Sequence, residues 1–229
     1  MGKKTDKENY IHEIYNKSTF VKVKPAFEIG KIIFSFVESC EINGERKLKN
    51  VINCYVTVAE MGLFAKKITS GRMYTNIENE KRNGQQYPAA VWKSPLGGVS
   101  EKKAAAQKLR TDGKAISRRF TLAPGAKKYA VLTATQCAGH TNEDGLIVPE
   151  IDDQNKTVIR VALENWDEVE KLGIMLEATV YAYMIYQTQK SYISSNKEAA
   201  DQKEHTTAKA QESDFTGPPI VWPEDVLNS

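Results

Sequence analysis

Alternating apolar and polar positions mark strands in the first part of the chain. Residues 18–23 alternate with a period of two, and residues 31–38 form a mostly apolar run. Residues 25–30, which begin with proline and end with glycine, have the composition of a connecting turn. Residues 51–58 are rich in β-branched side chains and follow the turn dipeptide Asn43-Gly44. This pattern predicts three consecutive strands, because the period of two matches the alternation of side chains along a strand.

A helical period follows these strands. Apolar residues recur every three to four positions over residues 59–69, at Met61, Phe64, Ala65 and Ile68. The order of strands and helix then repeats, with strand-like stretches at residues 87–92, 115–122, 129–137 and 156–163. The second helix is predicted over residues 165–192, where Asn165 is a suitable cap and acidic residues occupy the first turn.

The predicted fold class is therefore α+β, with curved antiparallel sheets that each end in a packing helix. Two β-β-β-(β)-α blocks, at about residues 17–72 and 85–192, form the body. Polar residues 1–16 are expected to be a flexible arm. Residues 193–229 combine a polar linker with an apolar, acidic tip, residues 215–227, which either docks on a protein partner or packs on the body.

Composition limits the classes of function. A hydrophobic content of 41% supports a substantial core, and no apolar run approaches the length of a membrane span. With no signal-like start, we expect a cytoplasmic protein with reduced thiols at Cys40, Cys54 and Cys137. The three histidines are dispersed, and the sequence has no phosphate-binding glycine motif. We therefore expect a protein that is not an enzyme and has no cofactor or metal site.

Charge is unevenly distributed along the chain. Residues 81–128 contain twelve basic residues and two acidic ones, a net charge of +10, whereas the whole protein carries +3. Residues 141–177 carry −7, so we expect a directed electrostatic field. Because aromatic residues and glycines are interspersed with the basic residues, the stretch is typical of a single-stranded nucleic acid surface. The alternative is a solvated lysine-rich loop.

A resemblance extends this interpretation. We expect one hairpin to carry two basic stretches, Ser117-Arg118-Arg119-Phe120 and Lys127-Lys128-Tyr129. Together with the repeated sheet-then-helix order of residues 18–192, this hairpin resembles the Whirly, PUR-repeat and transcriptional-coactivator group of single-stranded nucleic acid binding folds. That resemblance implies sheets that grip an unpaired strand. The order of body, linker and acidic tip also resembles bacterial single-stranded DNA binding proteins, although the long helix at residues 165–192 departs from their OB-fold.

These observations predict a non-enzymatic, largely sequence-independent single-stranded DNA binding protein of replication, recombination, a phage or a mobile element. The candidate nucleic-acid-binding residues are Arg82, Tyr87, Trp92, Lys93, Arg110, Lys114, Arg118, Arg119, Lys127, Lys128 and Tyr129. Phe120 is expected in the core, with Arg119 on the opposite face of the strand. Two alternatives stay open: an RNA-binding or transcription-modulating protein, and a structural or assembly protein such as a virion component. A homo-oligomer is compatible with each.

Overall fold

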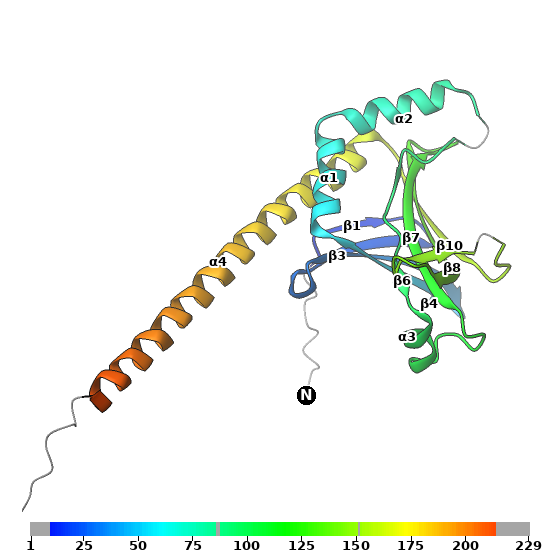
Figure 1. The fold of residues 1–229 in the computed structure, drawn as a ribbon. Helices are drawn as coiled ribbons and strands as arrows, with labels where there is room; N and C mark the ends of the chain where they lie inside the picture. The colour runs from blue at the N-terminus through cyan, green and yellow to red at the C-terminus, as the bar shows by residue number, and fades with distance from the viewer. Residues whose placement is uncertain (1–9, 86–87, 151, 214–229) are drawn as a thin grey trace, which may run out of the picture. The chain divides into compact units, whose positions relative to one another are not determined.

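Two antiparallel sheets and four α-helices make up the described part of the chain (Figure 1). The computed structural model describes residues 10–85, 88–150 and 152–213, with side chains described as far as residue 194. The chain divides into two compact units, Met1–Tyr183 and Met184–Ser229, and the first unit carries both sheets. The α+β class with curved antiparallel sheets is confirmed.

Sheet A is a four-stranded antiparallel meander. Its strands lie in the order β1 (His12–Tyr15), β2 (Thr19–Ala26), β3 (Lys31–Ile42) and β4 (Glu45–Thr57). The β3–β4 hairpin turns at Asn43 and Gly44, whose φ angles of 55° and 78° suit this dipeptide in a two-residue turn. The strands predicted at residues 18–23, 31–38 and 51–58 are confirmed as β2, β3 and β4, each longer than predicted, although Ser18 and Val58 lie outside β2 and β4.

Sheet B is built from the second part of the body. Its strands are β5 (Trp92–Lys93), β6 (Gly98–Val99), β7 (Ala115–Pro124), β8 (Ala130–Thr141), β9 (Ile147–Pro149) and β10 (Thr157–Leu163). The main order is β10-β8-β7-β5, while β6 pairs with β7 and β9 pairs with β8. The predicted hairpin of residues 115–122 and 129–137 is confirmed as β7 and β8.

Short loops connect the sheets to the helices. A 3₁₀ turn, η1 (Phe27–Ile29), precedes β3, and the helices are α1 (Val58–Thr69), α2 (Arg72–Arg82), α3 (Glu101–Ala106) and α4 (Trp166–Ser213). The Thr57 hydroxyl accepts a hydrogen bond from the Glu60 N–H and so caps α1. Asn165 caps α4 as predicted, because its side-chain oxygen accepts from the Glu168 N–H at 3.1 Å.

The core lies between the inner faces of the two sheets and is closed by helices. The Phe34 ring of sheet A stacks on the Phe120 ring of sheet B with 4.5 Å between centroids, and both side chains are fully buried. Helix α1 contributes Phe64 to the same cluster. The start of α4 packs on α1 at Gly173, where an added Cβ would lie 2.5 Å from Ile68 Cγ2. The predicted core position of Phe120 is therefore confirmed.

The three cysteines lie in strands, as predicted, and none forms a disulfide. Cys54 and Cys137 are buried, and Cys40 is half-buried. Burial raises the pKa of the Cys54 thiol to about 12, so this thiol stays protonated at neutral pH. None of the helices in the described residues combines the length and apolar character that crossing a membrane requires.

Several predicted segments differ from the structure. Residues 12–15 of the predicted flexible arm form β1, which pairs along its whole length with β2. The strand predicted at residues 87–92 is represented in the described residues by β5 alone. Helices α2 and α3 and strands β6 and β9 had not been predicted. The linker predicted after residue 193 is helical to Ser213, and the predicted tip, residues 215–227, lies outside the described residues.

Candidate nucleic-acid interface

The outer face of sheet A is an open surface that carries aromatic rings. Strand alternation places Tyr15, Phe20, Val37 and Val51 on this face, and the strand register aligns them in one row across β1, β2, β3 and β4. Tyr55 lies on the same face of β4, four residues from Val51. Tyr15 is 56% exposed and Tyr55 is 47% exposed, so both rings are accessible to a ligand.

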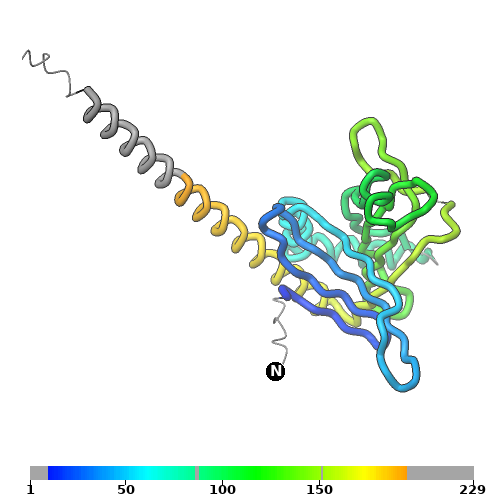
Figure 2. Tube along the Cα trace, turned by 90° about the horizontal axis from the view of Figure 1, so that it is seen from below, coloured from blue at the N-terminus to red at the C-terminus, as the bar shows by residue number. Residues whose placement is uncertain are grey.

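Within the described residues of the first unit, no helix covers this face (Figure 2). Figure 2, which looks up from below, shows the strands of sheet A nearest the viewer and helices α1 and α2 behind them. The Tyr15 hydroxyl donates a hydrogen bond to Glu13 Oε2 at 2.9 Å, and its ring lies 5.3 Å from that of Phe20. The two rings are therefore partly preorganised as a stacking platform.

Lysines are interspersed with the rings. Lys22, Lys24 and Lys31 share the outer face, because they occupy the same alternating positions as Phe20 and Tyr55 in the paired strands. The Lys22 ammonium lies 4.2 Å from the centroid of the Tyr10 ring and 3.4 Å from the Glu13 carboxylate. Glu13 already pairs with Lys22, whereas Lys31 has no ion-paired carboxylate among the described residues, so Lys31 can bind a phosphate while the rings stack on bases.

A groove of about 210 Å³ follows the free edge of β4. Lys31, Asn53 and Tyr55 line one side, and the loop from Pro95 to Val99 lines the other together with Arg118. The loop lies flat against β7 because Gly98 has no side chain: an added Cβ would lie 1.8 Å from the Ile116 carbonyl oxygen. The groove therefore continues the outer face of sheet A around its edge.

Arg118 is the most unusual cation of this groove. Its side chain is half-buried, and its Nε donates a hydrogen bond to the neutral Gln136 side-chain oxygen at 2.7 Å. Among the described residues no carboxylate lies within ion-pair distance of it. Burial lowers the pKa of Arg118, although a guanidinium stays charged at neutral pH. A partly desolvated cation without a counter-ion favours the arrival of an anion, and a guanidinium fits a phosphate.

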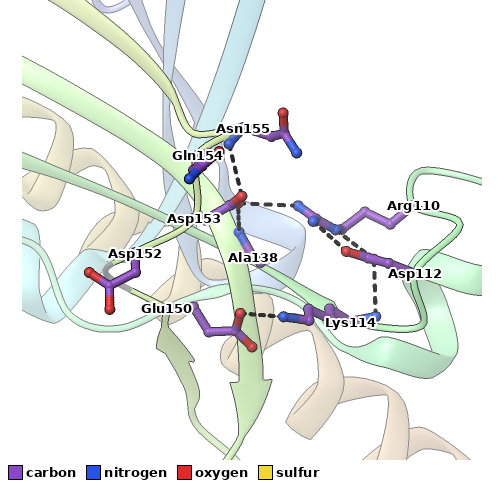
Figure 3. Close-up of a pocket in the computed structure, with 9 residues that line it drawn as sticks. All are labelled: Arg110, Asp112, Lys114, Ala138, Glu150, Asp152, Asp153, Gln154 and Asn155. Carbon is purple, nitrogen blue, oxygen red and sulfur yellow. Dashed lines mark hydrogen bonds and ion pairs between the residues drawn. The ribbon is translucent and has the colours of Figure 1, made fainter.

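Other predicted cations are engaged by carboxylates instead (Figure 3). Arg110 donates two hydrogen bonds to Asp112, at 2.9 and 2.6 Å, and lies 3.6 Å from Asp153. Lys114 pairs with Glu150. At the other end of the β7–β8 hairpin, Lys128 pairs with Glu164. The predicted directed field is therefore wrong in part, because acidic residues of the 141–177 segment fold back onto the basic stretch.

Two of the predicted stacking rings pack against other side chains of the protein, Trp92 in the core and the half-buried Tyr129 beside it. Trp92 is only 8% exposed, and its ring lies 4.2 Å from Phe64 and 5.1 Å from Phe120. The Lys81 ammonium lies 3.6 Å from the centroid of the Tyr129 ring, and Trp166 meets that ring edge-on at 6.1 Å. The prediction that Trp92 stacks on bases is wrong for this fold, and Tyr129 already has partners on its ring.

The remaining predicted residues are dispersed. Arg82 is exposed at the end of α2, and Lys127 is exposed in the β7–β8 turn. Lys93 and Arg119 lie on the outer face of sheet B, which confirms that Arg119 is opposite Phe120. Tyr87 lies outside the described residues. The structure thus does not gather the predicted residues into one surface.

The rings of sheet A were missed although a signal was present. Phe20 and Val21 are adjacent in a strand, so the two side chains must point to opposite faces. Val21 is fully buried, which leaves the Phe20 ring on the outer face. Val51 and Tyr55, separated by Ile52 and Cys54 of the inner face, follow the same rule on β4.

The Asp153 carboxylate accepts hydrogen bonds whose contribution to stability can be tested by changing the pH. Asp153 accepts hydrogen bonds from the Ala138 N–H at 2.6 Å and the Asn155 N–H at 3.0 Å, and these bonds lower its pKa, with Arg110 adding to the effect. We expect Asp153→Ala to lower the free energy of unfolding by about 1–3 kcal/mol at about pH 7, because a backbone donor loses its partner. Urea unfolding measures this difference.

The pH dependence has a defined sign. A carboxyl group with a lowered pKa in the folded protein stabilises it above the unfolded pKa, and this contribution is lost as the pH falls through the folded pKa. The difference between Asp153→Ala and the parent should therefore shrink below about pH 4. Asp152→Ala, an exposed neighbour, is the control and should leave stability unchanged at both pH values. An equal loss at neutral and acid pH would contradict the assignment.

No three His, Cys, Asp or Glu side chains converge as metal ligands do in the portion of the chain that is described.

No protein-family model, curated protein sequence or solved structure matches this chain.

Proposed function

We propose that this chain binds single-stranded DNA, largely without regard to sequence, across the outer face of sheet A. The observation that supports the proposal is one open sheet face that combines accessible Tyr15 and Tyr55 rings with lysines. That face ends in a groove where Arg118 has no carboxylate partner among the residues that the structure describes. The function is the one predicted from the sequence, whereas the surface is a different one.

The chemistry of the face favours an unpaired strand. Aromatic rings stack on bases only where the bases are splayed apart, so an intact duplex offers them little. Four strands at a spacing of about 4.8 Å give a platform about 14 Å wide, enough for a short run of nucleotides. Every base has a flat face, so stacking and phosphate contacts give affinity with little sequence preference.

The RNA-binding alternative uses the same face. Rings and cations do not distinguish ribose from deoxyribose, since that distinction needs contacts to the 2′-hydroxyl. A labelled oligo-dT and an oligo-U of equal length, compared by fluorescence anisotropy, separate the two. Tighter binding to oligo-U than to oligo-dT would replace DNA by RNA in the proposal.

One observation favours the assembly-protein alternative. Helix α4 carries apolar side chains that are about half exposed or more in the first unit, at Ile174 and Tyr181. Exposed apolar residues on a helix are typical of protein contacts. Sedimentation of the protein alone tests this function: ordered self-assembly without nucleic acid, together with no binding to oligo-dT, would favour it over the DNA-binding proposal.

The groove residues give the sharpest test of the DNA-binding proposal. Replacing both Lys31 and Arg118 with Gln is expected to weaken oligo-dT binding and to reduce the slope of log K against log salt by about 1.4, since two phosphate contacts are lost. Anisotropy titrations at several salt concentrations measure the slope. Arg118→Lys alone keeps the charge and checks that the side chain is not needed merely for folding.

A matched pair of cations serves as the control. Lys114 and Lys128 were predicted to bind phosphates from the sequence, but Glu150 and Glu164 pair with them. Replacing both with Gln removes the same charge and should leave the slope nearly unchanged. If the slope of log K against log salt falls in this control variant but not in the Lys31/Arg118 variant, the interface is the β7–β8 hairpin and not the edge of sheet A.

A further inference from the structure

The outer face of sheet B is a second surface, distinct from sheet A, that is open around Thr121 and Thr133, whereas Ser117 and Cys137 farther along the same face are buried. On β7 and β8 the side chains of Phe120, Leu122, Leu132 and Ala134 are fully buried. Strand alternation therefore places Thr121 and Thr133, which lie between them, on the opposite face. Both threonines are partly exposed, so this face is reached by solvent.

The strand register aligns polar side chains straight across this face. Lys93 on β5 pairs with Thr121 on β7, which pairs with Thr133 on β8, which in turn pairs with Arg160 on β10. Arg119 lies on the same face, two residues along β7 from Thr121. The result is a row of two hydroxyl groups between two cations, with a third cation beside it.

The three cations of this row are not neutralised within the described part of the chain. Lys93 and Arg160 are exposed and Arg119 is partly exposed, and none of the three has a carboxylate within ion-pair distance among the residues described. Asp153 and Glu150, whose charges act together with that of Arg119 on the Cys137 thiol, already have other partners: backbone N–H groups and Arg110 for Asp153, and Lys114 for Glu150. The positive charge of this face therefore remains available.

We propose that the outer face of sheet B binds the backbone of duplex DNA through its phosphates. Ammonium, guanidinium and hydroxyl groups contact phosphate oxygens and need no unpaired base. The row lacks aromatic side chains, so it has nothing to stack on a single strand. A duplex carries about twice the charge of a single strand per unit length, which favours it as the occupant of a purely cationic face.

The dimensions of the row agree with this occupant. Lys93 and Arg160 are separated by three strand spacings, about 14 Å. The major groove of a duplex is about 12 Å wide, so two cations at this separation can reach phosphates on either side of it. The protein would then hold a duplex on sheet B while sheet A remains free for a single strand. This face is independent of the surface assigned to single strands.

The test is a triple variant in which Lys93, Arg119 and Arg160 are replaced by Gln. Its affinity for a labelled duplex of about 20 base pairs at low salt should fall about tenfold or more, and the salt slope for duplex should fall by about 2.7, as expected for three lost contacts. Its affinity for oligo-dT should change by less than about threefold. In the parent protein, saturating oligo-dT should not displace the duplex.

A control triple, Lys67, Arg72 and Lys171 replaced by Gln, removes the same charge from exposed positions on α1, α2 and α4. An equal loss of duplex affinity in this control would overturn the proposal, because net charge alone would then explain the effect. Unchanged duplex binding in the first triple, or no duplex binding by the parent, would also overturn it. A change in sedimentation of the first triple without duplex binding would assign the face to a protein contact instead.

The two functions fail separately. Replacing Tyr15 and Tyr55 with Ala disables only sheet A, so duplex binding through sheet B should persist in that variant. Loss of both duplex and oligo-dT binding there would show a single shared surface and overturn the second site. Binding to duplex but never to oligo-dT would leave this inference standing and remove the proposed single-strand function.

Discussion

Replacing Trp92 with Ala is expected to lower the free energy of unfolding by about 3–5 kcal/mol, the usual cost of removing a large buried ring. The indole is 8% exposed and joins Phe64 of α1 to Phe120 of sheet B, at centroid distances of 4.2 and 5.1 Å. Its loss would leave a cavity where the helix meets the sheet. Urea unfolding followed by circular dichroism measures the change.

The same variant separates packing from binding. Because Trp92 lies in the core, the affinity of the folded fraction for oligo-dT should equal that of the parent. Tyr181→Ala, which removes an aromatic ring that is 59% exposed on α4, controls for the loss of a ring and should not change stability by more than about 0.5 kcal/mol. If Trp92→Ala is as stable as the parent but binds oligo-dT more weakly, the indole contacts the nucleic acid and does not belong to the core.

The periodicity of the sequence was sufficient to predict the central strands of both sheets. Residues 31–38 and 51–58 became β3 and β4 because one face of each is fully buried, as at Phe34 and Ile52. The strands extend past these limits toward Asn43, where the hairpin is largely exposed and its side chains carry no apolar alternation. Apolar residues alternate along a strand only where one face of that strand is buried. The hydrophobic pattern therefore does not identify the part of a strand that is exposed on both faces.

Helix α2 was missed for a related reason. It buries only Met73 and Ile77, four residues apart, within an otherwise polar stretch. Two apolar positions do not establish a helical period. The helical continuation of α4 to Ser213 could have been predicted from intrinsic propensity, since Ala, Glu, Lys and Gln dominate residues 197–212 and all favour helix. Low hydrophobicity alone indicated a disordered linker there.

The interface was harder to predict than the fold. Charge density along the sequence singled out the basic stretch, but Lys114–Glu150 and Lys128–Glu164 each join residues 36 positions apart. Such pairs depend on which strands become neighbours, and the sequence pattern does not give this. Trp92 had the same difficulty: β5 has only two residues, so alternation could not show which one faces the core.

Affinity for oligo-dT is expected to be most sensitive to removal of the aromatic rings on the outer face of sheet A. Tyr55→Ala and Tyr15→Ala should each weaken oligo-dT binding by about 1–3 kcal/mol, a factor of roughly 5 to 150, because each ring offers a stacking surface for one base. Both side chains are about half exposed, so their removal should leave the unfolding transition nearly unchanged. Anisotropy titration against oligo-dT, beside thermal unfolding of each variant, gives both quantities.

Tyr181→Ala is again the matched control, since it removes an equally exposed phenol from α4 and not from sheet A. It should bind oligo-dT as the parent does. The double variant of Tyr15 and Tyr55 should lose more than either single variant, because the residues lie on opposite edge strands, β1 and β4, and stack on different bases. If both single variants bind oligo-dT with the affinity of the parent while remaining folded, then sheet A does not contact the strand. The cations of the groove would in that case act on an anion without stacked bases.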